Sequence, residues 1–430
     1  MRSATVILAP AAARPRWTAL GLELLAATGF QPLGLWPLSL AAIGAFFLLV
    51  VRTAGWREAG LLGWLFGLAH FTFANSWIAT AFTYQANMPA ILGWAAVPLL
   101  SLYLAVYPAL AALGARWVAG GNRGWAAVLA FAGCWTVSEW LRAWVFTGFA
   151  WDPLGVVLLG GYGSPGIAAL APWLGTYALS GLAVLLGCAG ALLLAARRLL
   201  PLALLAALLV AGMLWPGPAE RDGRLRFTLV QPDIRQEVLN DEAHFESSYR
   251  KTVALTVPDR PGERRLVLWP ESGVPDYLLD GYPQRYYDHV TAFGDPRLAR
   301  LRIGRAIGRG SLLLTGTVDL EIRNGVAAGA RNAVTALDAD GRIVGGYDKA
   351  HLVPYGEYLP LRWLLEPLGA SRLVPGSLDF WPGPGPRTLD LGRWGKAGIQ
   401  ICYEIIFSGE VVDPANRPDY IFNPSNDGWF

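Results

Sequence analysis

Three residues in the C-terminal half of the chain could together perform nucleophilic catalysis: Glu271, Lys349 and Cys402. A cysteine becomes a strong nucleophile when a base removes its proton or when a cation stabilises its thiolate. A carboxylate and an ammonium group supply these two functions without a histidine. These residue types therefore predict a cysteine nucleophile that is served by a glutamate and a lysine.

Each of these three residues stands at the end of a segment whose residue pattern predicts a β-strand. The three predicted strands cover residues 266–269, 343–347 and 397–402. Side chains at strand ends are held in place by the rigid sheet, and this placement suits a catalytic site. The positions of the residues thus agree with the chemistry that their types suggest.

Taken singly, each residue also has an ordinary structural explanation. Cys402 could be a buried apolar residue, and Glu271 could cap a following helix. Lysine is scarce in this chain, because the 35 basic residues include only Lys251, Lys349 and Lys396. That scarcity favours a specific role for a compact ammonium group, although a surface lysine at position 349 stays an open alternative.

The elements that would position these residues alternate between strand-like and helix-like patterns from residue 217 onward. Predicted strands cover residues 225–230, 266–269, 312–318, 333–337, 343–347, 397–402 and 420–422. Predicted helices cover residues 241–255 and 282–307, with a short helix from Glu404. The pair Asp340-Gly341 predicts the turn of a hairpin, so part of the sheet is antiparallel. This pattern predicts a layered α/β sandwich for residues 217–430.

Charged side chains are distributed very unevenly along the 430 residues. Residues 1–216 contain 14 of them and residues 217–430 contain 53. The mean hydropathy of +0.37 is too high for an ordinary soluble protein of this length. We therefore expect a membrane domain over residues 1–216 and a domain with the charge density of a soluble protein over residues 217–430. This division excludes a single soluble domain, a disordered chain and a pure channel or carrier. The net charge of +3 is too small and too dispersed to suggest nucleic acid as a partner.

About seven apolar stretches in residues 1–216 are long enough, or nearly so, to be transmembrane helices. They cover residues 17–31, 34–51, 59–79, 88–115, 124–146, 166–195 and 199–215. Nine arginines fall on one side of these stretches and only Arg142 falls on the other. This bias predicts a cytoplasmic N-terminus and places everything after Trp215 on the outer side. Glu139 could pair with Arg142 as a structural anchor, or the pair could hold a lipid headgroup.

The sequence around the three reactive residues resembles the nitrilase superfamily, with the motifs in the order glutamate, lysine, cysteine. These motifs are W-P-E-S at 269–272, Y-D-K-A-H-L-V-P-Y-G-E-Y-L-P at 347–360 and G-I-Q-I-C-Y-E at 398–404. A fourth motif, N-P-S-N-D-G-W-F at 423–430, and the preceding apolar stretches narrow the resemblance. The whole chain is similar to the apolipoprotein N-acyltransferase family. This resemblance implies a polytopic α-helical membrane domain followed by a nitrilase-like α-β-β-α sandwich.

The resemblance implies a role for each matching residue. Cys402 would be the nucleophile, Glu271 the general base, and Lys349 the cation that stabilises the tetrahedral oxyanion. Four further residues would support the site or bind substrate: Glu357, Asn332, Tyr403 and Glu404. No cofactor is implied, and the four scattered histidines lack the spacing of metal ligands.

The implied reaction is a ping-pong transfer through a thioester. A fatty acyl chain would pass from a phospholipid, typically phosphatidylethanolamine, to Cys402. It would then pass to the α-amine of the N-terminal diacylglyceryl-cysteine of an apolipoprotein. The resemblance implies a multi-pass protein of the bacterial cytoplasmic (inner) membrane, in contact with membrane lipids, with the catalytic domain on the periplasmic side.

Two departures from the family pattern accompany this resemblance. Leu239-Asn240 stands where the family often has Lys-Trp, and this change could alter substrate preference. The sequence stops at Phe430 inside a family motif, so we expect it to lack a C-terminal segment and a last transmembrane helix. Two alternatives stay open: a membrane-tethered nitrilase-type amidase that uses water as acceptor, and a non-catalytic membrane scaffold.

Overall fold

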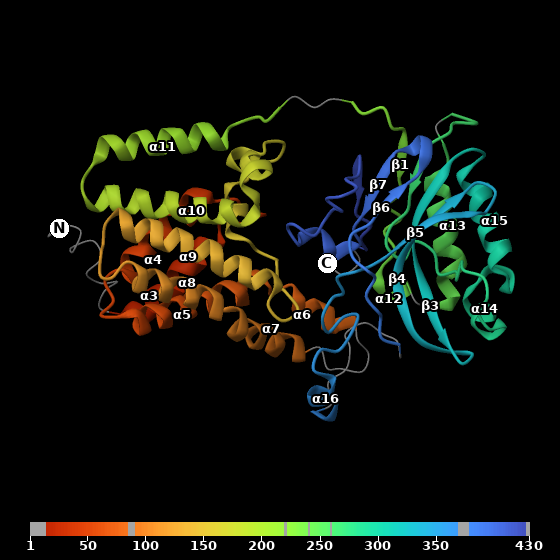
Figure 1. Ribbon diagram of the computed structural model, residues 1–430, viewed down its shortest axis with the longest axis horizontal. Coiled ribbons are helices and arrows are strands. Elements are labelled where there is room, and N and C mark those ends of the chain that lie inside the picture. Colours follow the sequence, from red (N-terminus) through yellow and green to blue (C-terminus); the bar gives the residue numbers. More distant parts are fainter. Residues whose placement is uncertain are drawn as a thin grey trace. The chain divides into compact units, whose positions relative to one another are not determined.

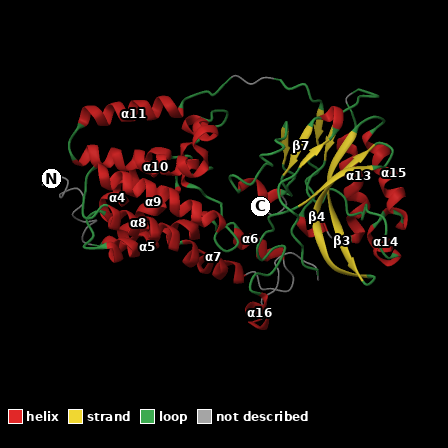
Figure 2. Cartoon of the chain, viewed as in Figure 1, coloured by secondary structure: helices red, strands yellow, loops and turns green. Residues whose placement is uncertain are grey.

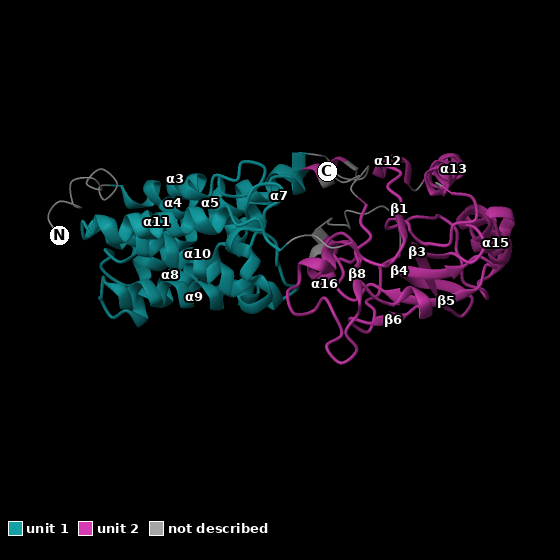
Figure 3. Cartoon of the chain, turned by 90° about the horizontal axis from the view of Figure 1, so that it is seen from above, with its two compact units in different colours: residues 1–79, 90–220 teal, residues 80–89, 221–430 magenta. Residues whose placement is uncertain are grey.

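A computed structural model describes residues 14–84, 91–218, 222–239, 241–258, 260–368 and 378–426. The chain forms two compact units (Figure 3), one of residues 1–79 and 90–220 and one of residues 80–89 and 221–430. Unit 1 is helical, and unit 2 contains all the strands described (Figures 1 and 2). The predictions for Asn240 and for the end of the last motif, residues 427–430, lie outside the described residues.

The long helices of unit 1 follow the predicted apolar stretches. They are α3 (Pro15–Ala27), α4 (Trp36–Val50), α5 (Trp56–Ala74), α7 (Ile91–Leu104), α8 (Val106–Val118), α9 (Trp125–Trp144), α10 (Ala171–Ala195) and α11 (Leu199–Met213). The 3-10 turns Leu154–Leu158 and Gly166–Leu170 also belong to unit 1. The short helix α6 (Ile78–Ala81) spans the sequence boundary at residue 79, and the 3-10 turn Phe82–Tyr84 is assigned to unit 2. The predicted stretch 88–115 is divided at Ala105 into α7 and α8. The structure therefore confirms that the predicted apolar stretches form helices. That these helices cross a membrane stays a prediction.

Two helical segments among the described residues are long and apolar enough to cross a membrane. They are Ile91–Val118, with 28 residues, and Gly166–Ala195, with 30 residues. Two further helices, Trp36–Val50 and Leu199–Met213, are apolar but shorter. The support for a membrane region in unit 1 therefore comes from the length and composition of these two segments.

Glycines allow the helices of unit 1 to pack closely. A Cβ atom added to Gly63 on α5 would lie 2.5 Å from the carbonyl oxygen of Pro108 on α8. One added to Gly44 on α4 would lie 2.3 Å from the carbonyl oxygen of Gly187 on α10. Contacts this short require glycine, and close backbone approach is typical of helices that pack in lipid.

Unit 2 contains a five-stranded and a three-stranded β-sheet. The larger sheet has the order β1 (Phe227–Leu229), β2 (Leu266–Leu268), β3 (Leu312–Arg323), β4 (Val326–Asp338) and β5 (Ile343–Asp348). The smaller sheet has the order β6 (Thr388–Asp390), β7 (Lys396–Ile399) and β8 (Tyr420–Phe422). Neighbours are parallel from β1 to β3 and between β7 and β8, and antiparallel elsewhere.

A strand is found in each of the seven predicted ranges, but the prediction missed β6 and shortened β3 and β4. It also extended β1 and β7 too far: β7 ends at Ile399, three residues before Cys402. Strand β6 has only three residues and follows a stretch rich in proline and glycine, so its sequence reads as a loop. Beyond Val318, β3 alternates between charged and apolar residues up to Arg323, as expected for a strand with one exposed face.

The two sheets pack face to face, and helices cover the other face of the larger sheet. Leu314 and Val334 of the larger sheet share a buried core with Ile399 of the smaller one. The neighbouring residue Leu313 points to the opposite face, where it packs with Ile303 of α15. That helical layer contains α13 (Phe245–Thr256), α14 (Gln284–Val290) and α15 (Pro296–Ile307), visible beside the larger sheet in Figure 1.

These observations confirm a layered α/β arrangement with a partly antiparallel sheet. Among the described residues of unit 2, the α-helices longer than four residues are α13, α14 and α15. The second outer helical layer of an α-β-β-α sandwich therefore stays a prediction.

Candidate active site

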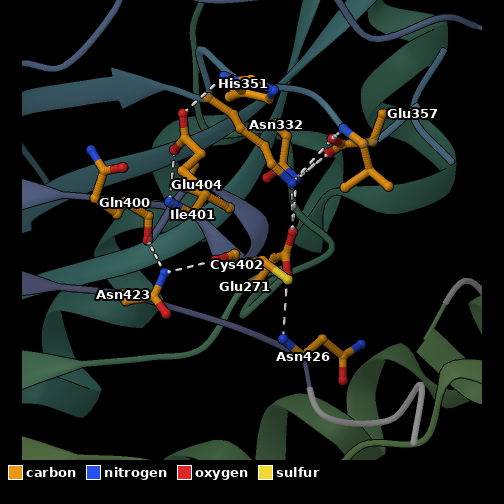
Figure 4. A network of polar contacts seen from close by, with 12 residues as sticks. Glu271, Asn332, His351, Glu357, Gln400, Ile401, Cys402, Glu404, Asn423 and Asn426 are labelled. Carbon is orange, nitrogen blue, oxygen red and sulfur yellow. Dashed lines mark hydrogen bonds and ion pairs between the residues drawn. The ribbon is translucent and has the colours of Figure 1, made fainter. Parts of the chain in front are cut away.

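Strands β2, β5 and β7 bring Glu271, Lys349 and Cys402 together. The ammonium nitrogen of Lys349 lies 3.8 Å from Oε1 of Glu271. Figure 4 shows the Cys402 thiol beside Glu271. The charges of Glu271 and Lys349 both act on the pKa of this thiol. Residues that are 131 positions apart in the sequence thus form one cluster because their strands end at the same edge of the sandwich.

Lys349 is the most deeply buried of the three, with 1% of its surface exposed. Its Nζ atom lies 3.0 Å from each carboxylate oxygen of Glu357. Burial by itself lowers the pKa of Lys349, but the nearby charges of Glu357 and Glu271 raise it above its usual value. The site therefore contains a fixed ammonium group whose charge is balanced by carboxylates.

Asn332 on β4 joins the two carboxylates. Its side-chain nitrogen donates one hydrogen bond to Glu271 Oε1 and one to Glu357 Oε1, each 2.8 Å long (Figure 4). An amide nitrogen has two N–H donors, and both are used here. The backbone N–H of Lys349 also donates to the carbonyl oxygen of Asn332, at 2.8 Å. Asn332 thus fixes the separation of two like charges around the lysine.

A close approach between strands positions Glu271. Strand β2 ends just before Trp269-Pro270, and proline cannot donate a ladder hydrogen bond. A Cβ atom added to Gly316 on β3 would lie 2.7 Å from the Cα atom of Glu271. Glycine is therefore required at position 316. On its other side, Glu271 Oε2 accepts a hydrogen bond of 3.3 Å from the backbone N–H of Asn426 (Figure 4).

Cys402 begins a short 3-10 helix, Cys402–Ile406, in a strained backbone conformation. Its φ angle of 49° lies in the left-handed region, which is unfavourable for residues other than glycine. The segment after β8 holds this conformation. The N–H of Cys402 donates to the carbonyl oxygen of Pro424 at 2.8 Å, and the carbonyl oxygen of Cys402 accepts from Asn423 Nδ2 at 3.2 Å.

The Cys402 thiol is protonated at neutral pH. Burial and the negative charge of Glu271 raise the pKa of Cys402 to about 12, although the positive charge of Lys349 opposes this shift. A thiol in this state is a poor nucleophile until a base removes its proton. Glu271 lies beside the thiol (Figure 4), where a carboxylate is positioned to act as such a base.

Glu404 connects the lysine loop to the cysteine turn. Its Oε1 atom accepts hydrogen bonds from the Tyr347 hydroxyl at 2.8 Å, from Ala350 N at 2.7 Å and from His351 N at 3.0 Å. Its Oε2 atom accepts from Ile401 N at 2.8 Å (Figure 4). A carboxylate suits this position because both of its oxygens only accept hydrogen bonds. Glu404 is therefore a positioning residue for both loops.

Tyr403 packs within the same turn, and its ring also lies 5.7 Å from that of His351, between centroids. It is 3% exposed, and its ring packs edge-on against Phe407 at 4.9 Å between centroids. Sequence reasoning did not single out three residues that the structure places in the network: Tyr347, Asn423 and Asn426. The only signal for them was their position inside the motifs.

A small cavity lies beside Glu271. Its lining includes Gln231, Ile234, Leu239 and Ser272. Leu239, which departs from the family pattern, therefore lines the same cavity as Glu271. Among the described residues, no group of three or more His, Cys, Asp or Glu side chains is arranged to hold a metal ion.

Comparison with known families first defines the class of the C-terminal half. Residues 233–430 match the family model described as carbon-nitrogen hydrolase, which makes unit 2 a nitrilase-like domain. Residues 24–189 match the apolipoprotein N-acyltransferase N-terminal domain. A structure comparison finds an amidase of the nitrilase superfamily from Nesterenkonia, at 17% identity over 49% of this chain and 68% of that one. Its TM-score of 0.26 is too low to add to the assignment.

Curated relatives then define the family. An apolipoprotein N-acyltransferase from Allorhizobium ampelinum is 35% identical over 87% of this chain and 69% of its own length. One from Rhodopseudomonas palustris is 32% identical over 94% of this chain and 76% of its own. The chain belongs to the apolipoprotein N-acyltransferase family. The resemblance inferred from the motifs is thereby confirmed.

The raised pKa of Cys402 predicts how its alkylation depends on pH. In a Cys134→Ala, Cys188→Ala background, the rate with iodoacetamide should rise about tenfold per pH unit between about pH 7 and pH 10, because the thiolate fraction grows at that rate below a pKa of about 12. Mass spectrometry of the alkylated protein gives the rate. A plateau near neutral pH would reveal a preformed thiolate and contradict this description.

The hydrogen bonds of Glu404 predict a large effect of Glu404→Gln. The amide replaces one acceptor oxygen by a donor, so at least one buried N–H loses its partner, and unit 2 should lose about 2–4 kcal/mol of stability. Denaturant unfolding measures this loss. Glu366→Gln, at an exposed glutamate, is the matched control and should have little effect. Equal unfolding curves for the two variants would contradict the positioning role of Glu404.

Proposed function

We propose that this chain is an N-acyltransferase that moves a fatty acyl chain from a phospholipid to the N-terminal diacylglyceryl-cysteine of apolipoproteins. One observation carries the proposal: a buried ammonium group, Lys349, held beside the Cys402 thiol by Glu271 and Glu357, in a chain of this family. Membership of the family implies lipid and lipoprotein substrates. The donor that we propose is phosphatidylethanolamine.

In the first half of the reaction, Glu271 removes the proton of the Cys402 thiol. The sulfur attacks the carbonyl carbon of the acyl ester, and the carbonyl oxygen takes up the negative charge of the tetrahedral intermediate. Lys349 stabilises this oxyanion, because its ammonium charge is already fixed in place. The intermediate collapses, the ester C–O bond breaks, and the lysophospholipid alkoxide takes the proton from Glu271. Cys402 is left as a thioester.

In the second half, the α-amine of the diacylglyceryl-cysteine attacks the thioester carbonyl carbon. Glu271 accepts a proton from the attacking nitrogen, and Lys349 again stabilises the oxyanion. The C–S bond breaks, and the cysteine sulfur recovers the proton from Glu271. The products are an amide on the lipoprotein and free Cys402. Asn332 and Glu357 support both halves by holding Glu271 and Lys349 in position.

Intact-protein mass spectrometry tests this proposal directly. After incubation with phosphatidylethanolamine, the purified chain should carry one fatty acyl group that neutral hydroxylamine releases. The adduct should be absent in Cys402→Ala and present in the matched control Cys188→Ala, because Cys188 is buried in the helical unit. Addition of a diacylated lipopeptide with a free N-terminus should discharge the adduct and yield the N-acylated peptide.

The outcomes of this experiment separate the alternatives. Release of free fatty acid at the same rate with and without the lipopeptide would favour a membrane-tethered amidase that transfers the acyl group to water. Folded protein that forms no adduct with phospholipid would contradict the acyltransferase and support the scaffold alternative.

We also propose that unit 1 is a multi-pass domain of about seven transmembrane helices in the bacterial cytoplasmic membrane. The N-terminus would be cytoplasmic and unit 2 would lie at the periplasmic face, as the arginine bias favours. The surface of α11 supports a lipid environment for unit 1. Leu200, Leu204 and Leu208 recur on one side of this helix and are 72%, 63% and 70% exposed.

Single cysteines test this orientation. In a chain without its native cysteines, Arg297→Cys on unit 2 should react with a membrane-impermeant maleimide added to spheroplasts. Arg57→Cys, at the start of α5, should react only after the membrane is permeabilised. Both arginines are exposed, so accessibility of the side chain does not differ between them. Labelling of Arg57→Cys in intact spheroplasts and protection of Arg297→Cys would contradict the proposed orientation.

A further inference from the structure

Unit 1 encloses a cavity that contains several charged side chains and plays no part in the reaction described above. Its charged and titratable lining residues are Glu23 on α3, His70 on α5, Tyr107 on α8, Glu139 and Arg142 on α9, and Asp152 after α9. Ionisable groups inside an apolar helical unit are costly, so they are kept where they bind something or pair with one another.

Two residues of α9 hold the segment that follows this helix. Glu139 Oε1 accepts hydrogen bonds from the Trp135 indole N–H at 3.2 Å and from Leu154 N at 2.8 Å. Arg142 donates to the carbonyl oxygens of residues 151 and 152, at 2.5 and 3.3 Å. Glu139 and Arg142 are only 6% and 3% exposed. The pair therefore acts as a structural anchor, and its burial leaves no surface for a lipid headgroup.

Three carboxylate oxygens around this cavity have no hydrogen-bond partner among the described residues. They are Glu23 Oε2, Glu139 Oε2 and Asp152 Oδ2. Glu23 is 1% exposed, and its other oxygen is bonded to Nδ1 of His70. Unpartnered buried oxygens from three separate segments are unusual, because buried polar atoms are nearly always satisfied.

The charges around the cavity do not balance. Among the described residues that line it, three carboxylates face one permanent cation, Arg142, and one group that is positive only when protonated, His70. The hydroxyl of Tyr107 is hydrogen-bonded to that of Tyr103. Even with His70 protonated, one negative charge is left over. An uncompensated charge in such an enclosed site is strongly unfavourable, so the cavity requires one more positive charge.

We propose that this cavity binds one monovalent positive charge, and that the bound charge holds α3, α5 and α9 together. The charge is either a proton, carried by a carboxyl group or its water, or an alkali metal ion that keeps water ligands. Direct chelation does not fit, because no described group of three His, Cys, Asp or Glu side chains is arranged to hold a metal ion. This inference concerns the stability of unit 1 and is independent of the proposed transfer reaction.

Thermal unfolding of the full chain in detergent tests the proposal. It is followed by tryptophan fluorescence, since 14 of the 19 tryptophans lie in residues 1–216. The probes are sodium, potassium and choline chloride at equal ionic strength, each over a range of pH. Glu139→Gln removes the excess charge but keeps an oxygen that can accept from Trp135 and Leu154. Glu58→Gln, at an exposed glutamate of α5, is the matched control.

Two results would support the proposal and would identify the source of the charge. If an alkali ion binds, sodium or potassium should raise the unfolding midpoint by about 3 °C over choline in the wild type and in Glu58→Gln, but not in Glu139→Gln. If a proton binds, the salts should be equivalent. Glu139→Gln should then unfold at a higher temperature than the wild type at high pH, and this difference should disappear at low pH.

One result would overturn the proposal. In that case the difference in unfolding midpoint between Glu139→Gln and the wild type would depend neither on the cation nor on pH. The control Glu58→Gln is expected to behave in this way. If Glu139→Gln does not fold, Asp152→Asn provides the same test. Asp152 also has an unpartnered carboxylate oxygen, and it lies outside the helices.

Discussion

The catalytic unit depends on one interaction, the pairing of the Lys349 ammonium with the carboxylates of Glu357 and Glu271. A charge that is only 1% exposed is tolerated because two oxygens of Glu357 lie 3.0 Å away and Glu271 lies 3.8 Å away. The same carboxylates repel each other, and Asn332 holds them apart by donating to both. Removing any one of these groups would leave a buried charge or donor unpaired.

This arrangement also explains the state of the nucleophile. Glu271 compensates Lys349, and burial together with the charge of Glu271 raises the pKa of Cys402 to about 12, so the resting site contains a thiol. In the proposed reaction, the proton moves when a substrate carbonyl is present to accept the negative charge. In that proposed step, Lys349 stabilises the charge without rearrangement, because its ammonium group is already held by Glu357. The backbone strain at Cys402 and the close approach at Gly316 maintain the geometry that this sequence of events needs.

Much of this architecture could be predicted from the sequence, and the limits have physical causes. Strand periodicity and strand ends located Glu271, Lys349 and Cys402, because the pattern of buried residues determines where a strand begins and ends. The bridging position of Asn332 depends on the register of β4 and β5, in which Ala333 pairs with Asp348, and local pattern does not determine that register.

Long-range contacts were the least predictable part of the structure. Glu404 connects two loops through the packing of separate sheets, so its four hydrogen bonds could not be read from its own neighbourhood. In the helical unit, apolar stretches located the helices, but the contact between Glu23 and His70 joins residues 47 positions apart. No helical periodicity relates residues so far apart.

The central claim is that the fixed charge of Lys349 stabilises the transition state for acylation of Cys402. The most direct test is the single-turnover rate of thioester formation with phosphatidylethanolamine in Lys349→Met, compared with Lys396→Met at an exposed lysine. We expect Lys349→Met to lower this rate by about 10²–10³-fold in protein that folds normally, and Lys396→Met to leave it unchanged. Acylation of Lys349→Met at the wild-type rate would contradict the account.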